Sequence, residues 1–223
     1  MDFAKINFSQ NSKYTNSPWL INYWPFNSHI QDIIGGCHLY NGYKANLISD
    51  RFGRPLSALS LNTGFYKMPS INYFPTGEFT LTSWIYLRGC NSLSRLFEFF
   101  NGVLNESIRL IICNQSNNTR FAYNNGSNLV AYLDTPLLPF NKWHHVAFTL
   151  SNNSMSTYYN GVLNGTAISP QKLINLTRLF NFIGRGSNFA GGEPDFNGII
   201  DELKIFKKAL NQKEIQYEMN NQI

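Results

Sequence analysis

Charged residues are scarce in this chain, which limits the partners that it can bind through charge alone. Asp, Glu, Lys and Arg make up 14% of its 223 residues, against roughly a quarter in an average soluble domain. The net charge of +5 is spread along the chain, and the densest basic runs, 50–54 and 204–213, form no extended stripe. We therefore expect no nucleic-acid partner.

Long apolar runs are also missing. No stretch reaches the roughly 18 consecutive apolar residues that span a membrane, so we expect no membrane insertion by this segment. The first residues, MDFAKINFSQNSKY, lack the basic-then-apolar pattern of a signal peptide. Sequons for N-glycosylation nevertheless occur at eight positions: Asn7, Asn105, Asn114, Asn117, Asn125, Asn152, Asn164 and Asn175. We expect an extracellular glycoprotein domain of a longer protein, either secreted or the ectodomain of a membrane protein.

Cysteine is rare, and the three cysteines, Cys37, Cys90 and Cys113, show no spacing typical of a metal site. In an oxidising compartment, one pair would form a disulfide and one thiol would be left over. Cys90 closes one strand-like run and Cys113 ends another, two runs later. An antiparallel zigzag would bring these ends to the same edge, which favours the pair Cys90–Cys113. Three unpaired thiols are the alternative.

Aromatic residues and short strand-like runs are what the chain has in abundance. It contains 18 Phe, 12 Tyr and 4 Trp, which supply ample material for a core. The run FTLTSWIYL (79–87) alternates, so that one face carries Phe79, Leu81, Ser83, Ile85 and Leu87. Further strand-like runs lie at 95–100, 107–113, 144–150, 178–184 and 198–206.

Two local signals complete the predicted fold. The Asn160-Gly161 pair within 156–166 favours a hairpin with a type I′ turn, in which both residues need positive φ. Helical character is confined to 211–219, where Asn211 and Glu214 have the spacing of a capping box. We predict an all-β domain at 19–219, an antiparallel two-sheet β-sandwich (jelly roll) with a short C-terminal helix. Residues 1–18 would form an N-terminal extension and 220–223 a tail.

Six segments, in this order, resemble the laminin-G-like, concanavalin A-like lectin jelly roll. They are LINYWPFNSHIQD (20–32), ISDRFGRPLSALSLN (48–62), GEFTLTSWIYL (77–87), NKWHHVAFTLS (141–151), STYYNGVLNGT (156–166) and FNGIIDELKIFKKALNQKEI (196–215). The closest resemblance is to the branch with pentraxin-type domains and adhesive modules, and it covers roughly residues 19–219. It implies that 198–206 is the closing strand, which returns beside the N-terminal strand.

The resemblance also implies a calcium ion where the first and last strands meet. The matching residues are Asp201, Asn27 and Asp32, whose oxygen atoms suit calcium. Asn27 stands where an acidic residue is common in the family, which would weaken the site. In the alternative, Asp201 pairs with Arg51 or caps backbone N–H groups, and no ion is bound. Glu202 is expected to face solvent, because adjacent residues of a strand point to opposite faces.

Catalytic patterns are incomplete. Glucanases of this fold resemble one another through a Glu-x-Asp-x-x-Glu strand, which places two carboxylates on one face. Only EPD (193–195) begins this pattern here, and Gly198 stands where the second Glu is needed. Glu98 has no partner carboxylate close in sequence. His144 and His145 are neighbours in a strand, so they cannot easily share a zinc ion. We therefore expect no enzymatic activity.

A ligand site is expected on loops at one edge of the sandwich. Arg185, Asn188, Glu193 and Asp195 form the most polar cluster, and Tyr123 adds an aromatic face for a sugar. The predicted function is a non-catalytic recognition or adhesion module that binds a glycan. The alternatives are binding of an extracellular protein through the same edge, or a spacer domain in a larger adhesin or receptor.

Overall fold

The computed structural model describes residues 17–126, 130–187 and 192–221. These residues form strands and one helix: β1 (Leu20–Trp24), β2 (Tyr40–Ile48), β3 (Ala58–Met68), β4 (Phe79–Leu87), β5 (Arg95–Phe100), β6 (Glu106–Ile111), β7 (Asn118–Asn125), β8 (Val130–Pro136), β9 (Trp143–Ser151), β10 (Ser154–Tyr159), β11 (Val162–Ile168), β12 (Phe180–Ile183), β13 (Phe196–Phe206) and α1 (Gln212–Asn220). The predicted all-β jelly roll with a C-terminal helix is confirmed.

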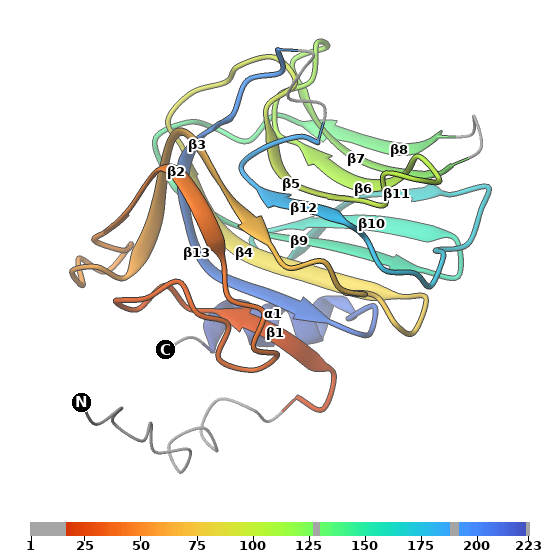
Figure 1. Ribbon diagram of the computed structural model, residues 1–223, viewed down its shortest axis with the longest axis horizontal. Coiled ribbons are helices and arrows are strands. Elements are labelled where there is room, and N and C mark those ends of the chain that lie inside the picture. The colour runs from red at the N-terminus through yellow and green to blue at the C-terminus, as the bar shows by residue number, and fades with distance from the viewer. Residues whose placement is uncertain (1–16, 127–129, 188–191, 222–223) are drawn as a thin grey trace.

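The strands form one hydrogen-bonded path that folds into two antiparallel layers (Figure 1). Its order is β11-β10-β9-β4-β13-β3-β12-β5-β6-β7-β8, with β1 paired to β13 and β2 paired to β3. Strand β3 passes between the layers, because residues 59–64 pair with β13 and residues 66–68 pair with β12. At the opposite edge, β8 of the upper layer lies against β11 of the lower layer.

The core lies between the two layers and consists largely of phenylalanine. The predicted alternation of β4 is confirmed, because Phe79, Leu81, Ser83, Ile85 and Leu87 are all buried. The rings of Phe121 in β7 and Phe148 in β9 meet across the layers with their centroids 5.6 Å apart. Aromatic contacts of this kind hold the sandwich together.

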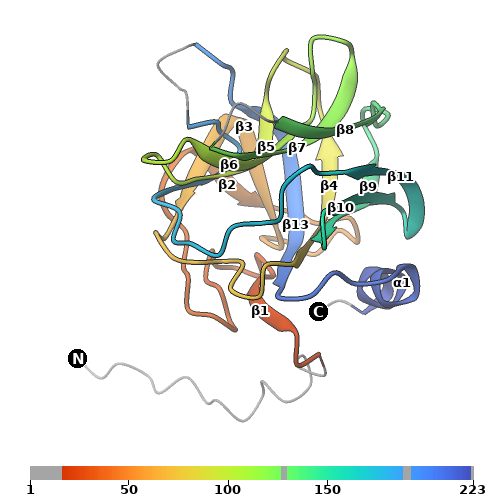
Figure 2. The ribbon, with the colours of Figure 1, turned by 90° about the vertical axis from the view of Figure 1, so that its right-hand side faces the viewer.

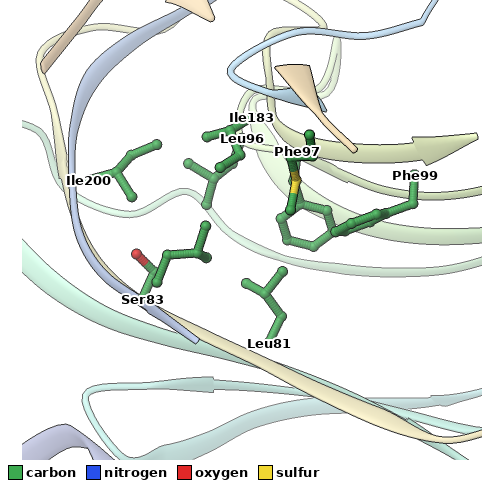
Figure 3. A pocket seen from close by; sticks show the side chains of 9 residues that line it. Leu81, Ser83, Leu96, Phe97, Phe99, Ile183 and Ile200 are labelled. Atoms are coloured by element: carbon green, nitrogen blue, oxygen red, sulfur yellow. The ribbon is translucent and has the colours of Figure 1, made fainter. Parts of the chain in front are cut away.

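A small gap in this core, of about 10 Å³, is not a ligand site. Figure 3 shows apolar side chains converging on it, among them Leu81, Leu96, Phe97, Phe99, Ile183 and Ile200. A cavity needs roughly 10–15 Å³ and several polar partners to hold one water molecule. The hydroxyl of Ser83 instead donates to the backbone carbonyl of Asp201 at 2.9 Å. A ligand must therefore bind outside the core.

The outer face of the lower layer is covered by α1 (Figure 2). The predicted capping box is confirmed, because the Asn211 side chain accepts from the Glu214 N–H and the Glu214 carboxylate accepts from the Asn211 N–H. Ile215 of α1 packs on Ala147 and Phe206. The β10–β11 hairpin also turns as predicted, with positive φ at both residues of its Asn-Gly turn, 50° and 74°.

A fully buried ion pair ties the segment before β12 to the upper layer. Arg178 donates to both carboxylate oxygens of Glu106, with Nε–Oε2 at 2.9 Å and Nη2–Oε1 at 2.5 Å. Both side chains are 0% exposed. Arg178 also donates to the carbonyls of Ile174 and Leu176, so its guanidinium organises the whole segment.

We predict that Arg178→Met lowers the free energy of unfolding by about 3–5 kcal/mol, because it leaves Glu106 as a buried charge without a counter-ion. Urea titration followed by circular dichroism measures this. The double variant Glu106→Gln, Arg178→Met is the control and should lose less than the single variant. A loss below about 1 kcal/mol in Arg178→Met would show that the pair does not hold this segment.

Candidate functional site

Asp201 lies in the middle of β13 and is 0% exposed. Its Oδ2 accepts a hydrogen bond from Nη1 of Arg51, so the two side chains form an ion pair. The pairing of Asp201 with Arg51 is the alternative to calcium binding that the sequence analysis gave. The second oxygen, Oδ1, is buried and has no hydrogen-bond partner among the described residues.

The prediction that Glu202 faces solvent is wrong. Glu202 is 3% exposed, and its carboxylate accepts a hydrogen bond from the Tyr23 hydroxyl. The register of β13 with β4 shifts between Asp201 and Lys204, and Glu202 has a φ of 55°. This β-bulge breaks the regular alternation of the strand, so both neighbouring carboxylates are buried.

Asp32 organises the loop after β1. Its two oxygens accept five hydrogen bonds, from the N–H groups of Tyr23, Ile34, Gly35 and Cys37 and from the Asn22 side chain, at 2.7–3.0 Å. A carboxylate that accepts several backbone N–H groups in this way holds a loop in shape. Asn27, the third residue predicted to bind calcium, is half-buried just beyond β1.

The donors around these residues do not suit calcium. Arg51 places a positive charge against Asp201, and Asp32 accepts from N–H donors where a cation would need free oxygen atoms. Within 17–126, 130–187 and 192–221, no group of three or more His, Cys, Asp or Glu residues is arranged to hold a metal ion.

Burial shifts the pKa values of two side chains, Asp201 and His145, on the outer face of the lower layer. Trp84 of β4 pairs with Asp201 on one side and with His145 of β9 on the other. Burial and then the charge of Glu202 raise the pKa of Asp201 to about 7, although Arg51 opposes this. Burial, with the positive charges of Lys204 and Arg51, lowers the pKa of His145 to about 3.

The loop predicted to bind a ligand is partly fixed by its own ion pairs. Arg185 holds Asp195 with two hydrogen bonds of 2.7 Å. The prediction for Tyr123 needs correcting. Tyr123 lies in β7 and is 1% exposed, and its hydroxyl donates to the carbonyl of Lys172 and accepts from the N–H of Ile174. Its ring is therefore not open to a sugar. Asn188 lies outside the described residues.

Glu193 is the member of the predicted set that lines a groove. This groove, of about 410 Å³, lies on the outer face of the upper layer, where β5 and β6 meet the loop after β12. We call it the β5–β6 groove. Its lining residues are Arg95, Glu98, Phe100, Asn105, Ser107, Arg109, Ser187 and Glu193.

Strand geometry explains why these side chains share one face. Phe97 and Phe99 point into the core, so Glu98 and Phe100 point outward. The same alternation in β6 turns Ser107 and Arg109 outward. Arg95 is three residues from Glu98 and would face the other way in a regular strand. The register shifts between Arg95 and Phe97, and this bulge brings it to the same side.

Ion pairs fix the shape of the β5–β6 groove. Arg95 binds Glu98 through Nη1 at 2.5 Å and Glu193 through Nη2 at 2.6 Å. Glu98 also accepts from the N–H of Ser187, which ties the loop to the strand. A Cβ at Gly186 would lie 2.5 Å from Nη1 of Arg95 and 2.8 Å from the Glu193 carboxylate, so a larger residue there would displace these side chains.

Sequence reasoning missed most of this groove. Glu98 was considered only as a catalytic acid, and Arg95 and Arg109 were not singled out. A signal was present, because each of Glu98 and Arg109 stands between two core residues of its strand. The missing knowledge was the pairing of β5 with β6, which sets Glu98 opposite Arg109.

The antiparallel strand order is that of a jelly-roll β-sandwich. The family model of the concanavalin A-like lectin/glucanases superfamily matches residues 61–216, which is more than half of the chain. The chain therefore belongs to this superfamily, as the laminin-G-like resemblance implied. A comparison with curated protein sequences finds no match.

Several solved structures share this fold. Domain 4 of AbnA, a GH43 extracellular arabinanase from Geobacillus stearothermophilus, was solved with arabinotriose; it is 19% identical with a TM-score of 0.70, over 91% of this chain and 98% of that chain. A Trypanosoma rangeli sialidase is 17% identical with a TM-score of 0.67, and the match covers 91% of this chain and 33% of the sialidase chain. A structure of botulinum neurotoxin type C, a toxin whose cell entry depends on interaction with two ganglioside molecules, is 16% identical with a TM-score of 0.66. The match covers 91% of this chain and 51% of the toxin chain. The chain thus spans about half of the toxin chain and a third of the sialidase chain.

Two further observations concern the setting of the domain. Cys90 and Cys113, the pair that the sequence favoured, form a disulfide with their Cα atoms 5.6 Å apart, and Cys37 is a buried thiol. In the part of the chain that the structure describes, no helix combines the length and the apolar character needed to cross a membrane.

We predict that calcium leaves the unfolding temperature of the domain unchanged, because Arg51 pairs with Asp201 and N–H donors occupy both oxygens of Asp32. Differential scanning fluorimetry with calcium and with chelator measures this. If calcium bound the folded domain, a calcium concentration of 100 times the dissociation constant would add about 2.7 kcal/mol to the free energy of unfolding. A rise of several degrees in calcium, abolished by Asp201→Ala, would restore the calcium prediction.

A second prediction concerns pH. Because the pKa of Asp201 is raised in the folded state, its stabilising contribution is present below about pH 4 and is lost as the pH rises toward 7. The free energy of unfolding of the wild type, minus that of Asp201→Asn, should therefore fall over this range, by up to about 4 kcal/mol. Urea titrations at each pH measure it.

His145→Asn is the matched control, since the shift of His145 has the opposite sign. The depressed pKa of His145 means that its contribution is present above about pH 6.5 and is lost as the pH falls toward 3. The difference between wild type and His145→Asn should therefore fall on acidification. A flat difference for Asp201→Asn between pH 4 and 7 would contradict the burial argument.

Proposed function

We propose that this domain is a non-catalytic recognition or adhesion module that binds a glycan in the β5–β6 groove. The observation that carries the proposal is the groove itself, whose volume of about 410 Å³ is in the range of ligand sites. Asn105 and Ser187 supply polar groups for sugar hydroxyls, and Phe100 supplies an aromatic face. The arabinotriose in the AbnA domain of the same fold adds support.

Binding without catalysis is supported by the state of the two carboxylates in the groove. Glycoside hydrolysis needs one carboxyl group as acid and a second as base or nucleophile. Glu98 and Glu193 are both in ion pairs with the same guanidinium, that of Arg95. This arrangement suits a fixed binding surface better than proton transfer.

An extracellular setting is part of the proposal. The Cys90–Cys113 disulfide favours an oxidising compartment. A secreted protein or an ectodomain would both meet this condition, and both would place the groove where cell-surface or matrix glycans occur.

A protein partner is the second candidate, favoured by one observation. Strand β11 exposes three apolar side chains, Val162, Leu163 and Ile168, at 59%, 45% and 75%. These side chains could pack against apolar groups of another protein. Such a partner would bind at β11 and not in the β5–β6 groove, so variants of the groove would not affect it.

We predict that Phe100→Ala weakens glycan binding about tenfold, because it removes the aromatic face of the groove while leaving the core rings in place. A glycan array identifies ligands for the wild type, and calorimetry then gives the dissociation constants. Tyr217→Ala is the matched control, since Tyr217 is an exposed aromatic residue of α1, which covers the other layer. Its affinity should equal that of the wild type.

Two results would reject the proposal. One is an array without any bound glycan, which would direct the search to protein partners at β11. The other is a bound glycan whose affinity is unchanged in Phe100→Ala, which would place the ligand elsewhere on the domain. The protein should be produced without N-glycans, because the Asn105 sequon lies in the groove.

A further inference from the structure

The charges of the β5–β6 groove are unevenly matched. Two arginines and two glutamates line it, but Arg95 takes both carboxylates, with Nη1 on Glu98 and Nη2 on Glu193. Arg109 lies opposite Glu98 in the β5–β6 pairing. It forms no hydrogen bond or ion pair with any residue that the structure describes.

The guanidinium of Arg109 is half-buried and points toward the groove. Its Nε is buried without a hydrogen-bond partner. Its two Nη groups have no protein acceptor and are not among the buried unsatisfied atoms, so they reach solvent in the groove. Burial lowers the pKa of Arg109 from its ordinary value, with the charge of Arg95 as a second cause, but an arginine stays positively charged in proteins.

The charges of Glu98 and Glu193 act on Arg109, but both carboxylates are bound by Arg95, so the Nη groups of Arg109 are donors without an acceptor. A carboxylate or a sulfate matches the two Nη groups of a guanidinium, because two of its oxygens can accept from them side by side. The groove therefore offers hydrogen-bond donors for one further anionic group, at the position that Arg109 defines.

An exposed aromatic ring lies on the same face of the sheet as Arg109. Across the sheet, Arg109 pairs with Ala122 of β7, which in turn pairs with Tyr132 of β8. Ala122 is 1% exposed and is therefore already covered, whereas Tyr132 is 53% exposed. Arg120 lies over the Tyr132 ring at 4.2 Å and is held by Asp134, so the position of this ring is fixed. Tyr132 stands two strands from Arg109, roughly 10 Å away.

We propose that the β5–β6 groove selects acidic saccharides, and that Arg109 binds the carboxylate or sulfate of the ligand. This rests on the proposed glycan-binding function and adds the chemical class of the ligand.

The experiment compares ligands with and without the acidic group. Trigalacturonic acid and its methyl ester form one pair, and sulfated and unsulfated lactose form the other. Calorimetry at low salt should show that the charged member of at least one pair binds at least tenfold more tightly than its neutral partner. Arg109→Gln should remove this preference, and Arg109→Lys should keep only part of it. Lys213→Gln on α1 carries the same change in charge and should keep the full preference.

Stability of the free protein is the second measurement. Arg109→Gln removes a guanidinium that makes no hydrogen bond or ion pair in the described residues, and the charges of Arg95 and Arg120 oppose those of Glu98 and Glu193 around it, so the variant should unfold at about the same temperature as the wild type. This rules out misfolding as the cause of lost binding. An unfolding temperature that falls by several degrees would show that Arg109 serves the fold, and would overturn the inference.

The other outcomes separate the inference from the function on which it rests. If neutral and charged probes bind equally, and Arg109→Gln changes neither, the acidic preference is wrong and glycan binding stands. Equal weakening of both probes in Arg109→Gln would make Arg109 a general hydrogen-bond donor, which also overturns the acidic preference. If neither the four probes nor an array of neutral and acidic glycans binds the wild type, both proposals fail.

Discussion

The antiparallel pairing of β13 positions most of the other elements of this domain. On one side, β13 pairs with β4 along nearly its whole length; on the other, it pairs first with β3 and then with β1. Because β3 continues from β13 to β12, the same hydrogen bonds that close the lower layer also set where the upper layer begins. The bulge at Glu202 sits in this strand, and it buries two carboxylates that a regular strand would separate.

The two layers carry different chemistry on their outer faces. The lower layer is covered by α1 and by the loop with Arg51, so its outer polar groups are buried and their pKa values shift. The upper layer is open where β5 and β6 meet the loop after β12, and its charged groups line a groove. A polar cluster therefore serves stability on one face and can serve recognition on the other. The difference comes from what covers each face, since both clusters use Arg and Glu or Asp.

Sequence alone predicted the features that depend on neighbours in the chain. The alternation of Phe79–Leu87, the Asn160-Gly161 turn and the capping box of α1 are local, and all three are confirmed. Features that depend on distant pairings were less accessible. The exposure of Glu202 was wrong because a bulge is a property of two strands, and Tyr123 was assigned to a loop although β6 and β8 make it a core strand residue. The β5–β6 groove needs residues from 95 to 193 together, which no local pattern reveals.

The odd thiol affects how the domain keeps its one disulfide. Cys37 is buried, and burial raises the pKa of its thiol, so little of the nucleophilic thiolate is present at neutral pH. Exchange between Cys37 and the Cys90–Cys113 bridge would require the loop held by Asp32 to open first. The hydrogen bonds to Asp32 thus disfavour disulfide exchange, because they keep the Cys37 thiol buried while that loop stays closed.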